Sequence, residues 1–204
     1  MRQILLATTN PHKVEEIRAI LAPLGIAIRS LDSLASVPEE PEEDEMTFQG
    51  NARLKARYYA GKTGLTCLAE DSGLEVDALS GAPGVHSARY SGTAGTRAER
   101  DRANNEKLLR ELSAFSTAPR SARFVCAMSV ARPDGSLVAE AIGTYDGEIA
   151  EAPRGENGFG YDPLLYLPDV RRTSAELSAA EKNARSHRGK AARSLAALLA
   201  TAEE

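Results

Sequence analysis

The chain has 204 residues, of which 42% are hydrophobic and 26% are charged. This length and apolar content suffice to bury a sizeable core, so we expect one domain over residues 1–204. The 29 acidic residues outnumber the 25 lysines and arginines, giving a formal net charge of -4. This charge argues against a protein that binds nucleic acid or a membrane surface, because both need a dominant basic field.

The cysteine and histidine residues argue against two further features, a disulfide and a zinc site. Cys67 and Cys126 each lie in an apolar run, which favours buried free thiols of a reducing compartment over a disulfide. The three histidines form no close cluster with cysteine, which argues against a zinc site. The N-terminus lacks the long apolar region of a signal peptide, and no apolar run is long enough to span a bilayer. We therefore expect a cytoplasmic protein.

Strand-like and helix-like segments alternate in the first part of the chain, which is typical of the α/β class. Residues 2–8 read as a buried strand. Asn10 and Pro11 then begin a helix, with Asn10 as the N-cap and Pro11 in the first turn. A second helix is expected from about Thr47 to Lys62, ended by Gly64.

The second part of the chain adds a predicted hairpin. A third helix, from about Thr96 to Leu112, precedes two β-like runs, Ala122–Ala131 and Ser136–Gly147. Pro133-Asp134-Gly135 joins the two runs and is a strong turn sequence, so an antiparallel part is expected in the sheet. Ser178-Ala-Ala-Glu181 is a capping box that begins a helical region reaching about Thr201, with a break near Gly189.

The run from Cys67 ends at two adjacent acids, Glu70 and Asp71, which Ser72 and Gly73 follow. We interpret this as a short buried strand that ends in a turn. Carboxylates at such a strand end can hold a divalent cation. The alternative is an Asx-turn in which Asp71 accepts the N–H groups of the next residues, and the pattern alone does not choose between the two.

Thr8-Thr-Asn-Pro-His-Lys13 lies between a strand and a helix N-terminus, where backbone N–H groups and the helix dipole favour an anion. The segment lacks the glycines of a P-loop, so phosphate contacts would come from its side chains. The alternative is simple helix capping beside a solvated lysine.

Gly155-Glu-Asn-Gly-Phe-Gly-Tyr-Asp-Pro163 places three glycines around two aromatic residues. Such a loop lets the backbone approach a ligand and presents a ring for stacking, or else its rings only plug the core. Downstream, Lys182 and Arg188 are donors that could bind a phosphate or a carbonyl oxygen of a ligand. The alternative is that both side chains are simply exposed to solvent.

These segments, together with Glu42-Glu43 and Ser87-Ala-Arg-Tyr-Ser-Gly92, occur in an order that resembles the inosine triphosphate pyrophosphatase family over essentially the whole chain. The resemblance implies a mixed, elongated, twisted α/β sheet flanked by helices, in two lobes with a central active-site cleft. It also implies a Mg²⁺ requirement, a homodimer, and hydrolysis of ITP, dITP and XTP to the monophosphate and pyrophosphate.

The same resemblance implies roles for individual residues. Asp71 matches the proton acceptor, and Glu42 and Asp71 match the metal-binding acids. The implied substrate contacts are Thr8, Thr9, Asn10, Pro11, His12, Lys13, Ser72, Phe159, Gly160, Tyr161, Asp162, Lys182, His187 and Arg188. The 6-keto oxygen of inosine or xanthine would accept hydrogen bonds from such donors, whereas the 6-amino group of adenine donates.

Two positions depart from the family pattern. The chain has Glu70 where a second aspartate is common, and Gly50 where an acid commonly precedes the asparagine. Two alternative functions remain: a pyrophosphatase for modified pyrimidine or methylated nucleotides, like the septum-formation-inhibitor proteins, and a nucleotide-binding regulatory module without catalysis.

Overall fold

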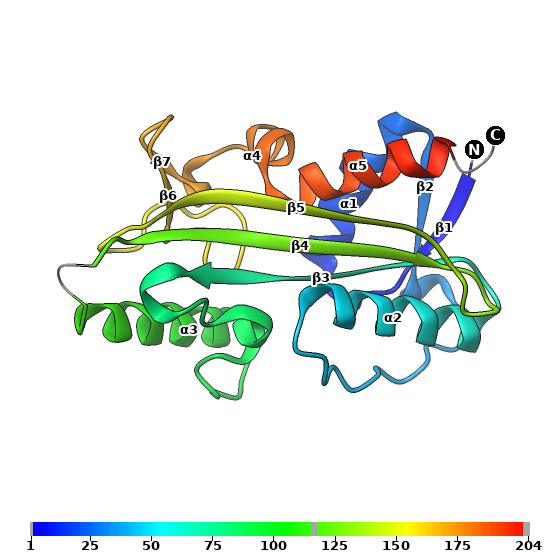
Figure 1. Ribbon diagram of the computed structural model, residues 1–204, viewed down its shortest axis with the longest axis horizontal. Helices are drawn as coiled ribbons and strands as arrows, with labels where there is room; N and C mark the ends of the chain where they lie inside the picture. The colour runs from blue at the N-terminus through cyan, green and yellow to red at the C-terminus, as the bar shows by residue number, and fades with distance from the viewer. Residues whose placement is uncertain (1, 116–117, 202–204) are drawn as a thin grey trace. The chain divides into compact units, whose positions relative to one another are not determined.

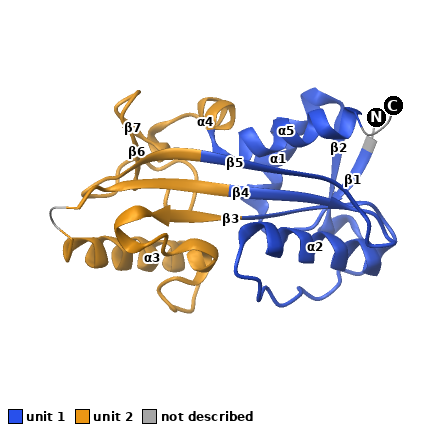
Figure 2. Cartoon of the chain, in the orientation of Figure 1, with its two compact units in different colours: residues 1–71, 126–144, 186–204 blue, residues 72–125, 145–185 orange. Residues whose placement is uncertain are grey.

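The computed structural model describes residues 2–115 and 118–201 (Figure 1). By its internal contacts the chain divides into two compact units (Figure 2). The first unit comprises residues 1–71, 126–144 and 186–204, and the second comprises residues 72–125 and 145–185. Strands β3 (Cys67–Val76), β4 (Ser121–Ala131) and β5 (Leu137–Ile149) contribute residues to both units.

The strands form one mixed sheet of seven strands in the order β2-β1-β3-β4-β5-β6-β7. Besides the three shared strands, its members are β1 (Arg2–Leu6), β2 (Ile26–Ser30), β6 (Leu165–Leu167) and β7 (Arg172–Thr173). β1 pairs in parallel with β2 and β3, whereas β6 runs antiparallel to both β5 and β7. The predicted α/β class and mixed sheet are confirmed.

Helices cover both faces of the sheet in the first unit (Figure 1). Ile4 and Leu6 of β1 pack with helices α1 (Pro11–Leu21) and α5 (His187–Thr201). Leu5 and Ala7, which alternate with them, pack instead with α2 (Phe48–Thr63). This alternation follows from the two-residue period of a strand, and burial on both faces explains why β1 reads as a continuous apolar run.

The second unit packs one main helix, α3 (Arg97–Ser113), against the sheet residues that belong to it. Leu108 and Leu112 of α3 share a core cluster with Leu74 and Tyr145 of the strands. The short helix α4 (Ala179–Arg185) completes this unit.

The helix starts follow the predicted capping residues. Asn10 Oδ1 accepts the N–H of His12 at 3.1 Å, and Thr47 Oγ1 accepts the N–H of Gly50 at 3.0 Å. Glu181 Oε2 accepts the Ser178 N–H at 2.8 Å, as expected for a capping box. Both predicted early helices and the capping box are therefore confirmed.

The interpretation of Asp71 as a strand end is wrong. β3 continues through Ser72 and Gly73 to Val76, because Leu74 and Val76 are buried and extend the alternation into the second unit. The predicted break in the C-terminal helical region is confirmed and falls at Ser186, three residues before Gly189. Strands β2, β6 and β7 were not predicted.

Several remaining expectations are borne out locally. Gly135 has a φ of 82° in the turn that joins β4 and β5, as the Pro-Asp-Gly sequence predicts. Cys67 and Cys126 are buried free thiols. Across residues 2–115 and 118–201, no helix is both long enough and apolar enough to cross a membrane.

Candidate active site

Adjacent acids on a strand point to opposite faces of a sheet, and this separates Glu70 from Asp71. Leu68 and Cys126 pack on the face that α1 and α5 cover, and Glu70 has its contacts there. Cys67 and Ala69 pack on the α2 face, where Asp71 contacts Asn51 and Lys55. The two carboxylates therefore belong to two different groups of side chains.

These acids lie on β3, whose neighbour β1 leads into the Thr8–Lys13 segment. The chain leaves β1 for β2 on one side and later adds β3 on the other side. Such a reversal of strand order is where open parallel sheets bind ligands, beyond the carboxyl ends of the strands. The first unit thus places the predicted phosphate segment beside the acids.

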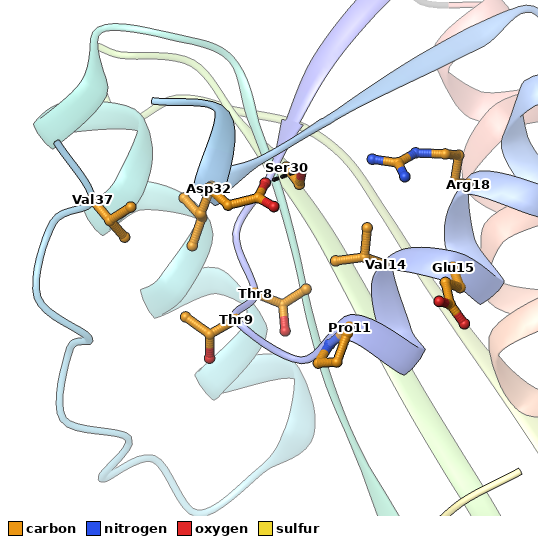
Figure 3. A pocket seen from close by; sticks show the side chains of 10 residues that line it. Thr8, Thr9, Pro11, Val14, Glu15, Arg18, Ser30, Asp32 and Val37 are labelled. Carbon is orange, nitrogen blue, oxygen red and sulfur yellow. Dashed lines mark hydrogen bonds between the residues drawn. The ribbon is translucent and has the colours of Figure 1, made fainter. Parts of the chain in front are cut away.

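The Thr8–Lys13 segment is both a helix cap and a lining of a pocket. Thr8 Oγ1 accepts the N–H of Asn10 at 3.2 Å, and Thr9 Oγ1 donates to Glu40 Oε1 at 2.6 Å. Thr8, Thr9 and Pro11 line a pocket of about 350 Å³, whose lining also includes Val14 and Arg18 of α1 (Figure 3). His12 is exposed at the start of α1.

Glu70 is surrounded by donors. Its Oε1 lies 2.7 Å from Lys13 Nζ and 3.3 Å from an Arg188 nitrogen, and its Oε2 accepts the Cys126 thiol at 3.0 Å. Burial alone would raise the pKa of Glu70, but the Arg188 guanidinium and the Lys13 ammonium hold it well below its ordinary value. Glu70 is therefore an ionised carboxylate bound by protein cations.

Arg188 is buried and joins two acids. Its second terminal nitrogen lies 2.5 Å from Glu16 Oε2 on α1. With Lys13 and Glu70, these side chains form a group of two cations and two anions. The predicted contact Arg188 thus lies in the first unit beside Lys13, and neighbouring His187 is also buried at the start of α5.

Asp71 is held by two residues of α2. Asn51 Nδ2 donates to Asp71 Oδ2 at 3.1 Å, and Lys55 Nζ lies 3.6 Å from Oδ1. Burial raises the pKa of the Asp71 carboxyl above its ordinary value, although the Lys55 ammonium opposes that rise. An acid with a raised pKa is better suited to accept a proton from water than an ordinary aspartate is.

Lys55 also lies 3.0 Å from Glu43 Oε2, so one ammonium joins Glu43 and Asp71. Burial would lower the pKa of Lys55, but the two acids together raise it above its ordinary value. Two carboxylates that converge on one cation are a suitable donor set for Mg²⁺, which usually takes one or two carboxylates together with phosphates and water. Among the described residues, no three His, Cys, Asp or Glu side chains are grouped to hold a metal by themselves.

The predicted metal acid Glu42 is exposed, whereas its neighbour Glu43 shares Lys55 with Asp71. The role of Glu42 stays a prediction, and the geometry makes Glu43 the better candidate. Spacing within the acid-rich stretch could not separate two consecutive residues.

Because Gly50 has no side chain, the side chain of another acid, Glu45, lies beside it. A Cβ at position 50 would lie 2.8 Å from Glu45 Cβ and 2.9 Å from Glu45 Oε2. The side chain of Glu45 therefore occupies the space into which a residue at 50 would project. Asn51 fixes this stretch, because its amide donates to the Glu45 carbonyl at 3.3 Å and accepts the Glu45 N–H at 3.2 Å.

The second unit contains the Phe159–Asp162 segment, which Asp162 organises. Asp162 Oδ2 accepts Lys182 Nζ at 2.6 Å and the Phe159 N–H at 2.9 Å, and its Oδ1 accepts the Ser174 hydroxyl at 2.7 Å. Gly158 has a φ of 76°, and any Cβ there would collide with the Asp162 carboxylate. The loop therefore needs this glycine.

The two aromatic residues of the loop have different roles. Tyr161 is buried and its hydroxyl donates to the Ser87 carbonyl at 2.9 Å, so this ring plugs the core. Phe159 is half-buried, with the Arg97 guanidinium carbon 4.9 Å and Lys182 Nζ 5.0 Å from its ring centroid. Phe159 is thus the ring that could stack on a ligand.

Gly160 is fixed from α3. Asp101 Oδ2 accepts its N–H at 2.9 Å, and Asn105 donates to its carbonyl at 3.0 Å. The same part of the second unit has a pocket of about 540 Å³, lined by residues of α3 and of the 153–163 loop. Ser72, on β3, also belongs to this unit.

The sequence reasoning missed Asn51 and Lys55. Both lie on the inward face of α2, one turn apart, among the buried residues Ala52 and Ala56. A lysine at a core position of a helix is itself a signal, because buried lysines need a charged partner.

Known proteins are similar to this chain over nearly its whole length. The sequence profile of the Ham1 family matches residues 4–198. The chain belongs to the Ham1 family. A dITP/XTP pyrophosphatase from an Exiguobacterium species is 48% identical over 197 residues, covering 96% of this chain and 95% of that protein.

Other known proteins are similar over comparable lengths. A dITP/XTP pyrophosphatase from Thermus thermophilus is 50% identical over 194 residues, covering 95% of this chain and 89% of that protein. The solved structure of a HAM1 protein from Coxiella burnetii matches with a TM-score of 0.87 and 42% identity, covering 98% of this chain and 100% of that one. A nucleoside-triphosphatase, dITP/XTP pyrophosphatase, from Mycobacterium abscessus gives a TM-score of 0.72 and 44% identity, covering 97% and 98%.

Proposed function

We propose that this Ham1 family protein hydrolyses non-standard purine nucleoside triphosphates, namely ITP, dITP and XTP, to the monophosphate and pyrophosphate. Relatives that carry the name dITP/XTP pyrophosphatase support this substrate class at 48% and 50% identity. The single structural observation that carries the proposal is Asp71, a buried carboxylate held by Asn51 and Lys55.

The phosphate end of the substrate needs positive charge, because its oxygens repel a nucleophile. Lys13, in the first turn of α1, supplies an ammonium beside the N-terminus of that helix. Lys55 supplies a second ammonium on the Asp71 side. Asp71 orients the attacking water and accepts its proton, and its raised pKa favours that transfer.

We propose Mg²⁺ as the cofactor, held by Asp71 with Glu43 or Glu42. When bound, Mg²⁺ would neutralise phosphate charge and lower the pKa of the attacking water.

Selectivity for the base is proposed to depend on donors that pair with a 6-keto oxygen. An adenine base would leave such donors unpaired, a mismatch that discriminates by up to about 10⁴-fold. Phe159 is proposed to stack on the base, and Lys182 to contribute a donor while Asp162 holds it at 2.6 Å.

The test is pyrophosphate release from ITP, XTP, GTP and ATP, with Mg²⁺ and with EDTA, for the wild type, Asp71→Asn and the control Asp146→Asn. Asp146 is an exposed aspartate on β5 and serves as a matched charge change. We expect turnover of ITP and XTP only, lost in EDTA and in Asp71→Asn. Orthophosphate in place of pyrophosphate, or turnover that survives Asp71→Asn, would contradict the proposal.

The alternative functions give different results in the same assay. Turnover of modified pyrimidine or methylated nucleotides without ITP or XTP would indicate the first alternative. Tight binding of ITP without any turnover would indicate a regulatory module. The homodimer stays a prediction, which light scattering on the purified protein tests directly.

A further inference from the structure

Glu70 is the most enclosed charged group near the phosphate segment. Its side chain has 0% exposure, and that of its partner Lys13 has 16%. A buried carboxylate is costly unless cations and hydrogen-bond donors compensate for lost hydration. The chemistry proposed above assigns no step to Glu70, so its burial needs a separate reason.

Four structural elements meet at Glu70. It projects from β3, and its partners Lys13, Arg188 and Cys126 come from α1, α5 and β4. Glu16, one turn after Lys13 on α1, holds the other side of Arg188 at 2.5 Å. Helix α1 is thus attached to this group at two points, and Lys13 is the member nearest the predicted phosphate segment in sequence.

The contact with Glu70 restricts Lys13. A lysine has a flexible stem of four carbons, and holding its ammonium in one place costs conformational entropy when a ligand binds. Glu70 Oε1, 2.7 Å away, takes one of the three ammonium hydrogens and leaves two for a ligand. The cost of ordering Lys13 is then met by folding, before any phosphate arrives.

We propose that Glu70 is a positioning residue that fixes the Lys13 ammonium for the polyphosphate of the substrate. The inference rests on the proposed function, because it takes a polyphosphate as the ligand. Glu70 itself does not touch the ligand and acts through Lys13. The same carboxylate also contacts Arg188, which Glu16 holds from its other side, and the effect on the ligand is transmitted through Lys13 alone.

Positioning and simple electrostatic attraction predict opposite changes in anion affinity for Glu70→Gln. Glu70→Gln removes a negative charge next to Lys13, so attraction alone would make the protein bind an anion more tightly. Loss of positioning makes it bind more weakly. We expect Glu70→Gln to weaken the binding of inorganic tripolyphosphate in EDTA by roughly tenfold, as measured by calorimetry, since hydrogen bonds to charged groups contribute on that order.

Glu16→Gln is the matched control, because Glu16 shares Arg188 with Glu70, whereas the carboxylate that lies 2.7 Å from Lys13 Nζ is that of Glu70. We expect it to bind tripolyphosphate within about twofold of the wild type, a difference below that of one lost charged hydrogen bond. Glu70→Asp keeps the charge on a shorter side chain and should recover part of the affinity. Thermal unfolding of each variant shows whether it is folded at the temperature of the titration.

A double-mutant cycle with Lys13→Met isolates the pair. If Glu70 acts through Lys13, then Glu70→Gln has no further effect on tripolyphosphate affinity in the Lys13→Met background. An equal loss in both backgrounds would overturn the proposal, and so would tighter binding by Glu70→Gln. Hydrolysis of ITP by the wild type is measured separately, so failure of the proposed activity is distinguished from failure of this inference.

Discussion

The Lys55 ammonium lies 3.6 Å from Asp71 Oδ1, and both side chains are about nine-tenths buried. The same nitrogen lies 3.0 Å from Glu43, so a single cation compensates for two carboxylates. Removing the Lys55 ammonium takes the shared cation from both carboxylates, which is more damaging than the loss of an exposed ion pair.

Lys55→Met should lower kcat by about 10- to 100-fold at pH values on the acid limb, because the cation that opposes protonation of Asp71 is lost. Burial raises the pKa of Asp71 and Lys55 lowers it, so without Lys55 this pKa rises further. A base acts only when deprotonated, so the acid limb of the pH profile of kcat should move to higher pH. The profile is measured with saturating ITP and Mg²⁺.

Lys62→Met is the control for this change, since Lys62 lies in the last turn of the same helix. It should leave both kcat and the acid limb unchanged. An acid limb that moves to lower pH in Lys55→Met would contradict the assigned effect of Lys55 on Asp71.

Gly50 and Gly61 offer a comparison within α2. A Cβ at Gly61 meets nothing within 4 Å, so Gly61→Ala should stabilise the helix by up to about 1 kcal/mol. A Cβ at Gly50 would lie 2.8 Å from Glu45 Cβ, so Gly50→Ala should lower the free energy of unfolding. Urea unfolding measures both.

Adding Glu45→Gly to Gly50→Ala removes the colliding Cβ and should restore part of the lost stability. If Gly50→Ala proved as stabilising as Gly61→Ala, Glu45 would not occupy the space beside residue 50 in solution.

Arg97 is expected to support the Phe159 ring, because its guanidinium carbon lies 4.9 Å from the ring centroid. Arg97→Met removes the charge and keeps much of the apolar volume. It should raise KM for ITP about two- to tenfold, which corresponds to a cation–π contact of about 0.5–1.4 kcal/mol, and leave tripolyphosphate affinity unchanged. Steady-state kinetics with Arg100→Met, a change at an exposed arginine of the same helix, provides the control.

The sequence predicted the helix starts well because capping is local. Asn10, Thr47 and Ser178 each satisfy N–H groups within three residues, so the signal lies in a few consecutive letters. Strands β6 and β7 were missed because they are short, with three and two residues, and their pairing is decided by distant partners.

The acids of β3 show the limit of local reasoning at the site. Glu70 and Asp71 are adjacent in sequence, and this pattern predicts one shared site for a divalent cation. The strand continues to Val76, and its pleat turns the two carboxylates toward different helices. Their partners lie far away in sequence at Asn51 and Arg188, which no local pattern reveals.

Stability should depend on pH through Glu70. Its pKa is held well below the ordinary value in the folded protein, so its contribution to the free energy of unfolding is present above the ordinary pKa of a glutamate. That contribution is lost as the pH falls toward the folded-state pKa, because protonation removes the charge that attracts Lys13 and Arg188. Between about pH 6 and pH 3, the free energy of unfolding measured in urea should therefore fall more steeply with decreasing pH in the wild type than in Glu70→Gln.

Salt distinguishes this buried group from exposed acids. Glu181 is exposed, and a hydrogen bond from Arg172 lowers its pKa to about 2. The contribution of Glu181 to the free energy of unfolding should decrease when the urea unfolding series is repeated at about 1 M salt, where the Debye length is about 3 Å. The steeper loss of stability with falling pH in the wild type than in Glu70→Gln should persist at that salt concentration. Solvent ions do not reach the Glu70 side chain, which has 0% exposure. Equal slopes for the two proteins at low salt would mean that Glu70 is not ionised in the folded state.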